Sequence, residues 1–401
     1  MRDIANIVKI FKKKMIGPLL LIFQIVITFT VIVNATHIIS NKTQLLNTPT
    51  GADQKNTFYI SFYSTDKDLL NENQVKLDMQ KITSLNTVLS AAPINAIPMI
   101  GNGTFDSLYT DVDKTLGDSG AIYYTNNAAV KTLDMEILAG ENFSEQDVLY
   151  VKPNSEQWPD SIIITKAFAE FLYPDDWRQV VSKLLYTNVG TIRVKGVVDK
   201  MQAPWYYWRN VEFGIFEPRV ALSEEMKYVV RAEKDQINSA MSQVEALFLK
   251  TSGRIINKIE TFDEVRNHAL STEQGTVSIL KSLIIILSLI TVFGIIGQSS
   301  YSINARKKQI GTRRALGASK LQIIQYFLTE NILISTIGIL LGMISCIVLN
   351  LVLVDNFSLP RLPFHYLGFG VFAIYLISLL SVLYPAYKAA NISPAIATRE
   401  M

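Results

Sequence analysis

Four long apolar windows constrain this chain more than any other feature of its sequence. They lie within residues 16–39, 276–303, 326–354 and 364–385, and each reaches the roughly 20 residues that a helix needs to cross a bilayer. Because hydrocarbon offers no hydrogen bonds to an exposed backbone, a crossing segment of this kind must be helical. The sequence therefore predicts an α-helical integral membrane protein with four transmembrane helices and a large domain between the first and the second.

The first window has an alternative interpretation as a cleavable leader, because Lys12, Lys13 and Lys14 precede it. The apolar core of a secretory leader usually has about 7–15 residues and is followed by a small-residue cleavage site. This window continues to Ile39, and residues 34–37 offer no such site. We therefore interpret it as a retained anchor.

Charge predicts the orientation of the spans, because cytoplasmic flanks are rich in Lys and Arg. The stretch RKKQIGTRRALGASK, residues 306–320, carries six basic side chains and no acidic one, and the N-terminus is also basic. The sequence thus predicts three cytoplasmic segments: a basic N-terminus (1–15), a segment at 304–325 and a tail (386–401). Residues 40–275 and a short loop at 355–363 are then external.

The external segment is predicted to be an α+β domain. Residues 56–64 alternate like a strand, 71–83 form an amphipathic helix, and the apolar stretch 94–100 completes a β-α-β start. Residues 226–265 are strand, helix and strand. Further strands are expected at 120–125, 161–165 and 191–199, with a short helix at 166–173. The β-α-β elements at both ends indicate one subdomain with a second inserted into it.

No signature of catalysis occurs in the sequence. The motifs H-E-x-x-H, G-x-S-x-G and the phosphate-binding G-x-x-x-x-G-K-[ST] are absent, and the three histidines (His37, His268, His365) are far apart. The single cysteine, Cys346, lies in the third window, so no disulfide can form within the chain. The basic residues flank the spans rather than forming a nucleic-acid footprint. We expect a non-catalytic chain that binds no cofactor or metal and no nucleic acid, with the lipid bilayer as its surroundings.

The tryptophans lie beside prolines. WPDS, PDDW and PWYYW contain Trp158, Trp177, Trp205 and Trp208. Such rings serve as a ligand platform in some proteins, and loop packing or an interface is the more common role. The sequence leaves both interpretations open.

The basic stretch 306–320 needs a second explanation beyond topology. A cytoplasmic flank accounts for Arg306, Lys307 and Lys308. Beyond them, apolar residues recur at helical spacing and are interrupted by Gly311 and Gly317. This pattern predicts a short helix along the cytoplasmic surface, a small-residue turn and a second helix that enters the membrane.

The stretch RKKQIGTRRALGASKLQIIQYFLTENILIS, with Glu330 at the head of the next span, resembles the signature of the FtsX/MacB-like permeases of ABC transporters. The C-terminal YPAYKAANISPAIATRE is similar to the closing motif of that family, and LDMEILAGENFSEQD, SIIITKAFAEFLYPDD and IRVKGVVDKM are similar to stretches of the MacB-type periplasmic core. Two positions depart from the family pattern, Gln309 in place of Glu and Thr398 in place of Leu. The resemblance extends over nearly the whole chain.

The resemblance implies a multi-pass protein of the bacterial cytoplasmic membrane with a periplasmic or extracellular domain. It implies pairing with a second permease, a separate ABC ATPase that binds ATP and Mg, and, in exporters, an adaptor and an outer-membrane channel. It also places ATPase coupling in ten consecutive or near-consecutive residues: Gln309, Ile310, Gly311, Arg313, Arg314, Ala315, Leu316, Gly317, Ala318 and Ser319.

Several roles remain open within that family. The leading one is export of a peptide, toxin or hydrophobic compound, driven by motion of the external domain. The alternatives are an FtsX-like mechanotransmitter that regulates an external enzyme such as a cell-wall hydrolase, and a lipoprotein-releasing permease. A membrane-anchored sensor fits less well, because the predicted cytoplasmic segments are too short for a signalling domain.

Overall fold

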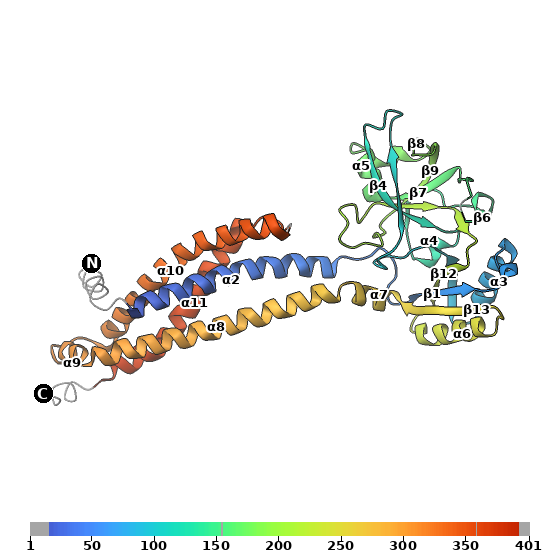
Figure 1. Ribbon diagram of the computed structural model, residues 1–401. Helices are drawn as coiled ribbons and strands as arrows, with labels where there is room; N and C mark the ends of the chain where they lie inside the picture. Colours follow the sequence, from blue (N-terminus) through green and yellow to red (C-terminus); the bar gives the residue numbers. More distant parts are fainter. Residues whose placement is uncertain (1–15, 154, 358, 393–401) are drawn as a thin grey trace. The chain divides into compact units, whose positions relative to one another are not determined.

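The computed structural model describes residues 16–153, 155–357 and 359–392 (Figure 1). The chain divides into a helical unit, made of residues 1–47 and 272–401, and an α/β unit, made of residues 48–271. The predicted basic N-terminus at residues 1–15 and the departure at Thr398 lie outside the described residues.

The helical unit contains four long helices: α2 (Ile16–Asn47), α8 (Ser271–Ala305), α10 (Lys320–Phe357) and α11 (Phe364–Ala390). All four are long and apolar enough to cross a membrane. Each contains one of the apolar windows and extends beyond it, α2 to Asn47 and α11 to Ala390. The windows are shorter because polar turns that continue a helix beyond the hydrocarbon leave no hydropathy signal.

Small residues let α2 pack closely against α10. Gly338 and Gly342 are four residues apart on one face of α10; a methyl group on Gly338 would lie 2.7 Å from Ile25, and one on Gly342 would lie 3.0 Å from Phe29. Close backbone approach of this kind gains van der Waals contact where there is no hydrophobic driving force between helices. Helix α2 also packs against α11.

Helix α8 joins α2 through a few polar contacts. The Gln24 amide donates to the Ile290 carbonyl at 2.8 Å, and the hydroxyls of Thr28 and Thr291 lie 2.8 Å apart. Nearer the end of α2, the Lys42 ammonium lies 2.6 Å from a carboxylate oxygen of Glu273. These contacts tie the two helices that lead to the α/β unit.

A four-stranded sheet unites the two ends of the α/β unit. Its order is β13-β1-β12-β2, and its strands are β1 (Thr57–Ser64), β2 (Val88–Pro93), β12 (Glu225–Ala232) and β13 (Arg254–Thr261). Helix α3 (Glu72–Thr83) lies between β1 and β2, α6 (Ile237–Leu249) lies between β12 and β13, and α7 (Phe262–Ala269) follows β13. The prediction that both ends belong to one subdomain is confirmed.

The inserted residues form a second, seven-stranded sheet of order β5-β9-β7-β10-β4-β3-β8. Its strands are β3 (Thr104–Tyr109), β4 (Gly117–Tyr124), β5 (Ile137–Gly140), β7 (Ser161–Thr165), β8 (Leu184–Tyr186), β9 (Thr191–Val198) and β10 (Gly214–Glu217). Because β8 also pairs with β9, the sheet closes on itself. The inserted residues also form α4 (Ala129–Thr132), α5 (Lys166–Leu172), two short 3-10 helices, and the parallel pair β6 (Leu149–Val151) and β11 (Arg219–Ala221).

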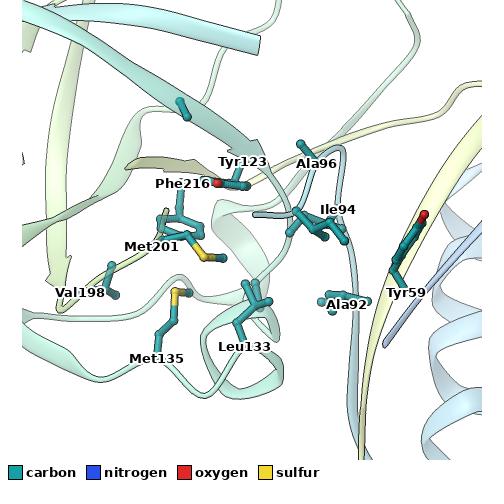
Figure 2. Packing of buried hydrophobic residues seen from close by; sticks show 14 of the residues in the cluster. Tyr59, Ala92, Ile94, Ala96, Tyr123, Leu133, Met135, Val198, Met201 and Phe216 are labelled. Carbon is teal, nitrogen blue, oxygen red and sulfur yellow. The ribbon is translucent and has the colours of Figure 1, made fainter. Parts of the chain in front are cut away.

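The strand β1 serves two apolar cores, because successive side chains of a strand point to opposite faces. Phe58, Ile60 and Phe62 are buried in a cluster that includes residues of α3 and α6. Tyr59 belongs to another cluster, with residues of the inserted part such as Met201 and Phe216 (Figure 2). The two subdomains therefore share a core.

The prediction of a strand at residues 94–100 is wrong. The strand is β2, at Val88–Pro93, and of residues 94–100 only Ile94 forms an isolated bridge, to Thr125. Ile94, Ala96 and Ile97 are buried in the shared core as part of a loop (Figure 2). A buried apolar loop has the composition of a strand, whereas the small residues of β2 gave a weak strand signal.

Candidate functional site

The stretch that the sequence singled out forms a helix, a turn and the start of a second helix. Helix α9 (Lys307–Ala315) follows α8 almost directly, and α10 begins at Lys320. The predicted succession of short helix, small-residue turn and second helix is thus present in the structure. We call residues 306–320 the coupling segment, after the role that the sequence resemblance implies for them.

Gly317 makes the turn possible. Its φ is +94°, a left-handed conformation that strains other residues. Its N–H donates to the Arg314 carbonyl at 3.1 Å, and the Ala318 N–H donates to the Arg313 carbonyl at 3.0 Å. This pair of bonds is a Schellman motif, which ends α9 with its last carbonyls satisfied.

Ser319 caps the start of α10. Its hydroxyl accepts a hydrogen bond from the Gln322 N–H at 3.2 Å, and the Gln322 side chain accepts one from the Ser319 N–H at 2.8 Å. This reciprocal arrangement is a capping box. The Arg314 guanidinium also donates to the Ala318 carbonyl at 2.8 Å, so the turn is held from both sides.

A buried ion pair fastens the coupling segment to α10. The two terminal nitrogens of Arg306 each lie 2.8 Å from one carboxylate oxygen of Glu330, and Arg306 also donates to the Tyr326 hydroxyl at 3.2 Å. Glu330 is 7% exposed. Arg313 lies over the ring of Tyr326, 4.9 Å from its centroid. Removing one partner of such a pair would leave a buried charge without compensation.

The coupling segment has a buried face and an exposed face. Ile310 and Gly311 are buried, and Ile310 packs in a cluster with Ile303, Phe327 and Ala386, which belong to α8, α10 and α11. The exposed face carries Gln309, Arg313, Ala315, Leu316, Gly317 and Ser319. Leu316 is 83% exposed. Arg314 and Ala318 are half-buried.

The sequence pointed to the right segment but missed its attachment. Arg306 was interpreted as a topological flank and Glu330 as part of a motif, and nothing in their spacing indicated that they pair. The only available signal was an acidic residue at the head of an apolar span, where a charge needs a partner. Among the described residues, no group of three or more His, Cys, Asp or Glu could hold a metal ion.

The tryptophans lie in three separate places. Trp158 stacks with Arg219 and Trp177 with Arg178, at 4.6 and 4.4 Å between the guanidinium carbon and the ring centroid. Trp205 and Trp208 contact one another edge to face, with centroids 5.6 Å apart. The first two are packing contacts, and Trp205 lines a cleft.

The architecture is that of a multi-span membrane protein with a large α/β domain between its first and second spans. Residues 281–394 match the family model described as FtsX-like permease C-terminal. The chain is 26% identical to the macrolide export ATP-binding/permease protein MacB of Bradyrhizobium diazoefficiens over 238 residues, which cover 56% of this chain and 36% of the relative. It is 22% identical to MacB of Campylobacter jejuni over 325 residues, 78% of this chain and 48% of the relative.

Two further similarities complete the comparison. The lipoprotein-releasing system transmembrane protein LolC of Haemophilus influenzae is 32% identical over 153 residues, 36% of this chain and 37% of that protein. The crystal structure of the periplasmic region of MacB from Actinobacillus actinomycetemcomitans covers 56% of this chain and 97% of that one, at 12% identity and a TM-score of 0.33. The chain spans less than half the length of these MacB relatives.

The chain is similar to FtsX/MacB-like ABC permeases, the family that its sequence motifs resemble. Its four long apolar helices, with the α/β unit between the first and the second, are those of a membrane protein.

Proposed function

We propose that this chain is the permease subunit of a MacB-like ABC transporter. A separate ATPase binds the exposed face of the coupling segment, and ATP hydrolysis there drives motion of the periplasmic domain. The cargo is a peptide, toxin or hydrophobic compound that is exported from the outer face of the membrane. Two copies of the chain, or this chain and a related permease, pair in the transporter, and an adaptor and an outer-membrane channel complete it.

The observation that carries this proposal is the two-faced coupling segment. Its buried face packs against the ends of α8, α10 and α11, and the Arg306–Glu330 pair clamps it to α10. Its exposed face presents the apolar side chain of Leu316, which a bound ATPase would cover. A push on this face would pass directly to α8, which leads to the α/β unit. The ATPase faces the cytoplasm, so the coupling segment and both termini are on that side.

The proposal is tested by reconstitution. The purified chain in lipid nanodiscs should hydrolyse no ATP, and adding its cognate ATPase should give a complex with activity. If the isolated chain hydrolysed ATP as fast as the complex with the ATPase, after controls for contaminants, the proposal would be contradicted. Identifying the external proteins that co-purify distinguishes export from regulation of a cell-wall hydrolase.

Lipoprotein release is a second candidate, favoured by the similarity to LolC. It predicts that the reconstituted complex releases a membrane-anchored lipoprotein into solution in an ATP-dependent manner. An exporter of peptides or hydrophobic compounds would leave such a lipoprotein in the bilayer.

A further inference from the structure

The α/β unit contains an aromatic cleft of about 230 Å³ at the edge of the core that its two subdomains share. The loop at 204–207, Pro-Trp-Tyr-Tyr, forms one wall, and α7 forms another. Tyr59 and Glu260, which are paired in neighbouring strands, contribute from the four-stranded sheet. We call this the aromatic cleft. Neither the coupling segment nor the membrane spans contribute to it.

The aromatic wall is held in place by its neighbours. The Met99 N–H donates to the Ala203 carbonyl at 3.2 Å, and the Gly101 N–H donates to the Pro204 carbonyl at 2.9 Å. Met99 has a φ of +62°, which costs free energy in a residue with a side chain and persists only where surrounding contacts enforce it. Within the 204–207 loop, the Tyr207 side chain is 75% exposed. The wall therefore presents a large aromatic side chain to solvent from a well-supported backbone.

Glu260 is the carboxylate that lines the cleft, and it is held in place. Its side chain is 15% exposed, and its Oε2 atom accepts a hydrogen bond from the buried Tyr59 hydroxyl at 3.1 Å. Burial and the charge of Glu260 raise the pKa of Tyr59 well above its ordinary value, so the hydroxyl keeps its proton and donates. The carboxylate is thus a fixed acceptor beside aromatic rings.

The basic side chains around Glu260 are more exposed than Glu260 itself. The Lys258 ammonium lies 2.9 Å from Glu260, and its side chain is 56% exposed. The His268 ring nitrogen lies 3.9 Å from Glu260, and its side chain is 77% exposed. An exposed ion pair of this kind is worth only about 0–1 kcal/mol, so Lys258 can leave at little cost. Its ammonium marks a position that a different cation can take.

We propose that the aromatic cleft binds an organic ammonium or guanidinium group carried on an apolar body. The cation replaces the Lys258 ammonium at Glu260, and the apolar body packs against Trp205 and Tyr207. Aromatic faces attract cations through their electron-rich rings, and a carboxylate gives the charge-assisted hydrogen bonds that orient the group. The proposal rests on the proposed export role only in treating this ligand as cargo. Binding itself requires no ATPase.

Two charged side chains of β13, Lys258 and Glu260, make the test sharp, because their variants should have effects of opposite sign. The full chain in nanodiscs, without ATPase, is titrated with phenethylammonium, a primary ammonium on an aromatic body, and binding is followed by calorimetry and by the change in tryptophan fluorescence. Glu260→Gln should weaken binding about ten-fold or more, because a hydrogen bond to a charged group is lost. Lys258→Ala should tighten binding about two- to five-fold, because the internal competitor is removed.

Two further variants control for folding and location. Tyr207→Ala should weaken binding without affecting the fold, since its side chain is largely exposed. Glu245→Gln, an exposed substitution on α6, should leave the affinity unchanged. An acetylated Phe-Lys-Phe amide distinguishes the sources of the cation, because tighter binding of this peptide than of phenethylammonium assigns the site to peptide side chains.

Three results would overturn the proposal. They are weaker binding of phenethylammonium to Lys258→Ala, equal binding to Glu260→Gln, and tighter binding of the anion 8-anilinonaphthalene-1-sulfonate than of phenethylammonium. Failure of the export proposal is measured separately, by the absence of an ATPase complex. Cation binding in the isolated chain would stand in that case.

Discussion

The helical unit and the α/β unit bury polar groups in different ways. In the α/β unit, Asp78 and Arg254 form a fully buried ion pair, with 2.5 Å between Oδ2 and Nη2. The Arg254 guanidinium lies between the rings of Phe62 and Phe248, at 4.9 and 5.0 Å from their centroids. The Tyr228 hydroxyl also donates to Asp78, at 2.9 Å. A charged network thus joins α3 to β12 and β13 inside an apolar core.

In the helical unit, the polar contacts described within the spans join neutral groups. The Asn331 amide donates to the Ser378 hydroxyl at 2.8 Å, and Thr28 meets Thr291. The ion pairs described there lie toward the ends of the helices, where Arg306 meets Glu330 and Lys42 meets Glu273. A charge in mid-membrane is costly even when it is paired, whereas an aqueous domain can enclose one well-bonded pair. The surroundings, lipid for the spans and water for the α/β unit, explain why one unit encloses a charged pair and the other buries neutral polar groups.

The largest expected effect follows from the buried pair. Asp78→Ala should lower the free energy of unfolding by about 3–5 kcal/mol, because Arg254 would remain buried and uncompensated. Chemical denaturation of the full chain, followed by tryptophan fluorescence, measures this change. Glu72→Ala removes the exposed Glu72–Lys76 pair on α3 and should cost at most about 1 kcal/mol. Equal losses in the two variants would mean that the buried pair contributes no more to stability than an exposed one.

The second expected effect is a pH dependence of the free energy of unfolding, which Glu217 causes. Glu217 is 4% exposed, and burial, opposed by Arg219 and reinforced by Asp106, raises its pKa to about 7. The folded state therefore binds a proton more tightly than the unfolded state, so stability should fall as the pH rises from about 4.5 to about 7. The expected loss is on the order of 3 kcal/mol.

The Glu217→Gln variant isolates this contribution. Its unfolding free energy should lack the decline seen in the unaltered chain between pH 4.5 and 7, because the amide does not titrate. Asp118 and Asp147, whose pKa values are lowered, act in the opposite direction and are present in both proteins. Parallel pH profiles for the two proteins would contradict the assignment to Glu217.

Packing between α2 and α10 should show an intermediate effect. Gly342→Leu places a side chain where a methyl group already comes within 3.0 Å of Phe29, and overpacking costs about 1–3 kcal/mol. Gly368 on α11 has no atoms within 4 Å of such a methyl group, so Gly368→Leu is the matched control. Thermal unfolding in nanodiscs should separate the two variants. The same melting temperature for both would mean that α2 and α10 are not packed closely there.

The two units also differ in how well the sequence predicted them. The spans could be recognised because hydrophobicity over some 20 residues is a local signal. The α9 turn could be recognised because Gly317 interrupts a helical pattern, and its left-handed φ gives the reason. The closed seven-stranded sheet could not be foreseen, since its closure depends on β8 pairing with both β3 and β9. Such pairings leave no mark on the separate strands.

The same reasoning applies to the buried charges. Asp78 and Arg254 lie 176 residues apart, and Arg306 and Glu330 lie 24 residues apart. In the sequence around it, each of these charges looks like an ordinary surface residue. Asn126 lies in a loop of the α/β unit and is only 8% exposed, so a cysteine there would label poorly. Asn238 is exposed and is the better position for an introduced cysteine, in a background where Cys346 is replaced. External labelling at Asn238 and its absence at Ser319 would test the proposed orientation.

Gly317 is a poor probe of ATPase docking by itself. A methyl group on Gly317 would meet no atom of the described residues within 4 Å, yet its φ of +94° strains any larger residue there whatever the partner does. Asparagine tolerates this conformation better than leucine. Loss of function in Gly317→Leu, with retention in Gly317→Asn, would therefore report on the turn rather than on the contact.

The most direct measurement is the affinity of the cognate ATPase for the chain and for its Leu316→Ala variant, both in nanodiscs. Leu316 is 83% exposed, so its truncation should change stability by less than about 0.5 kcal/mol. If the ATPase buries it, binding should weaken about 10- to 150-fold, the equivalent of about 1.5–3 kcal/mol of lost burial. Leu249→Ala, at an exposed leucine of α6, is the matched control and should bind normally. Normal affinity for Leu316→Ala would contradict the account, since the exposed face would then not be the docking surface.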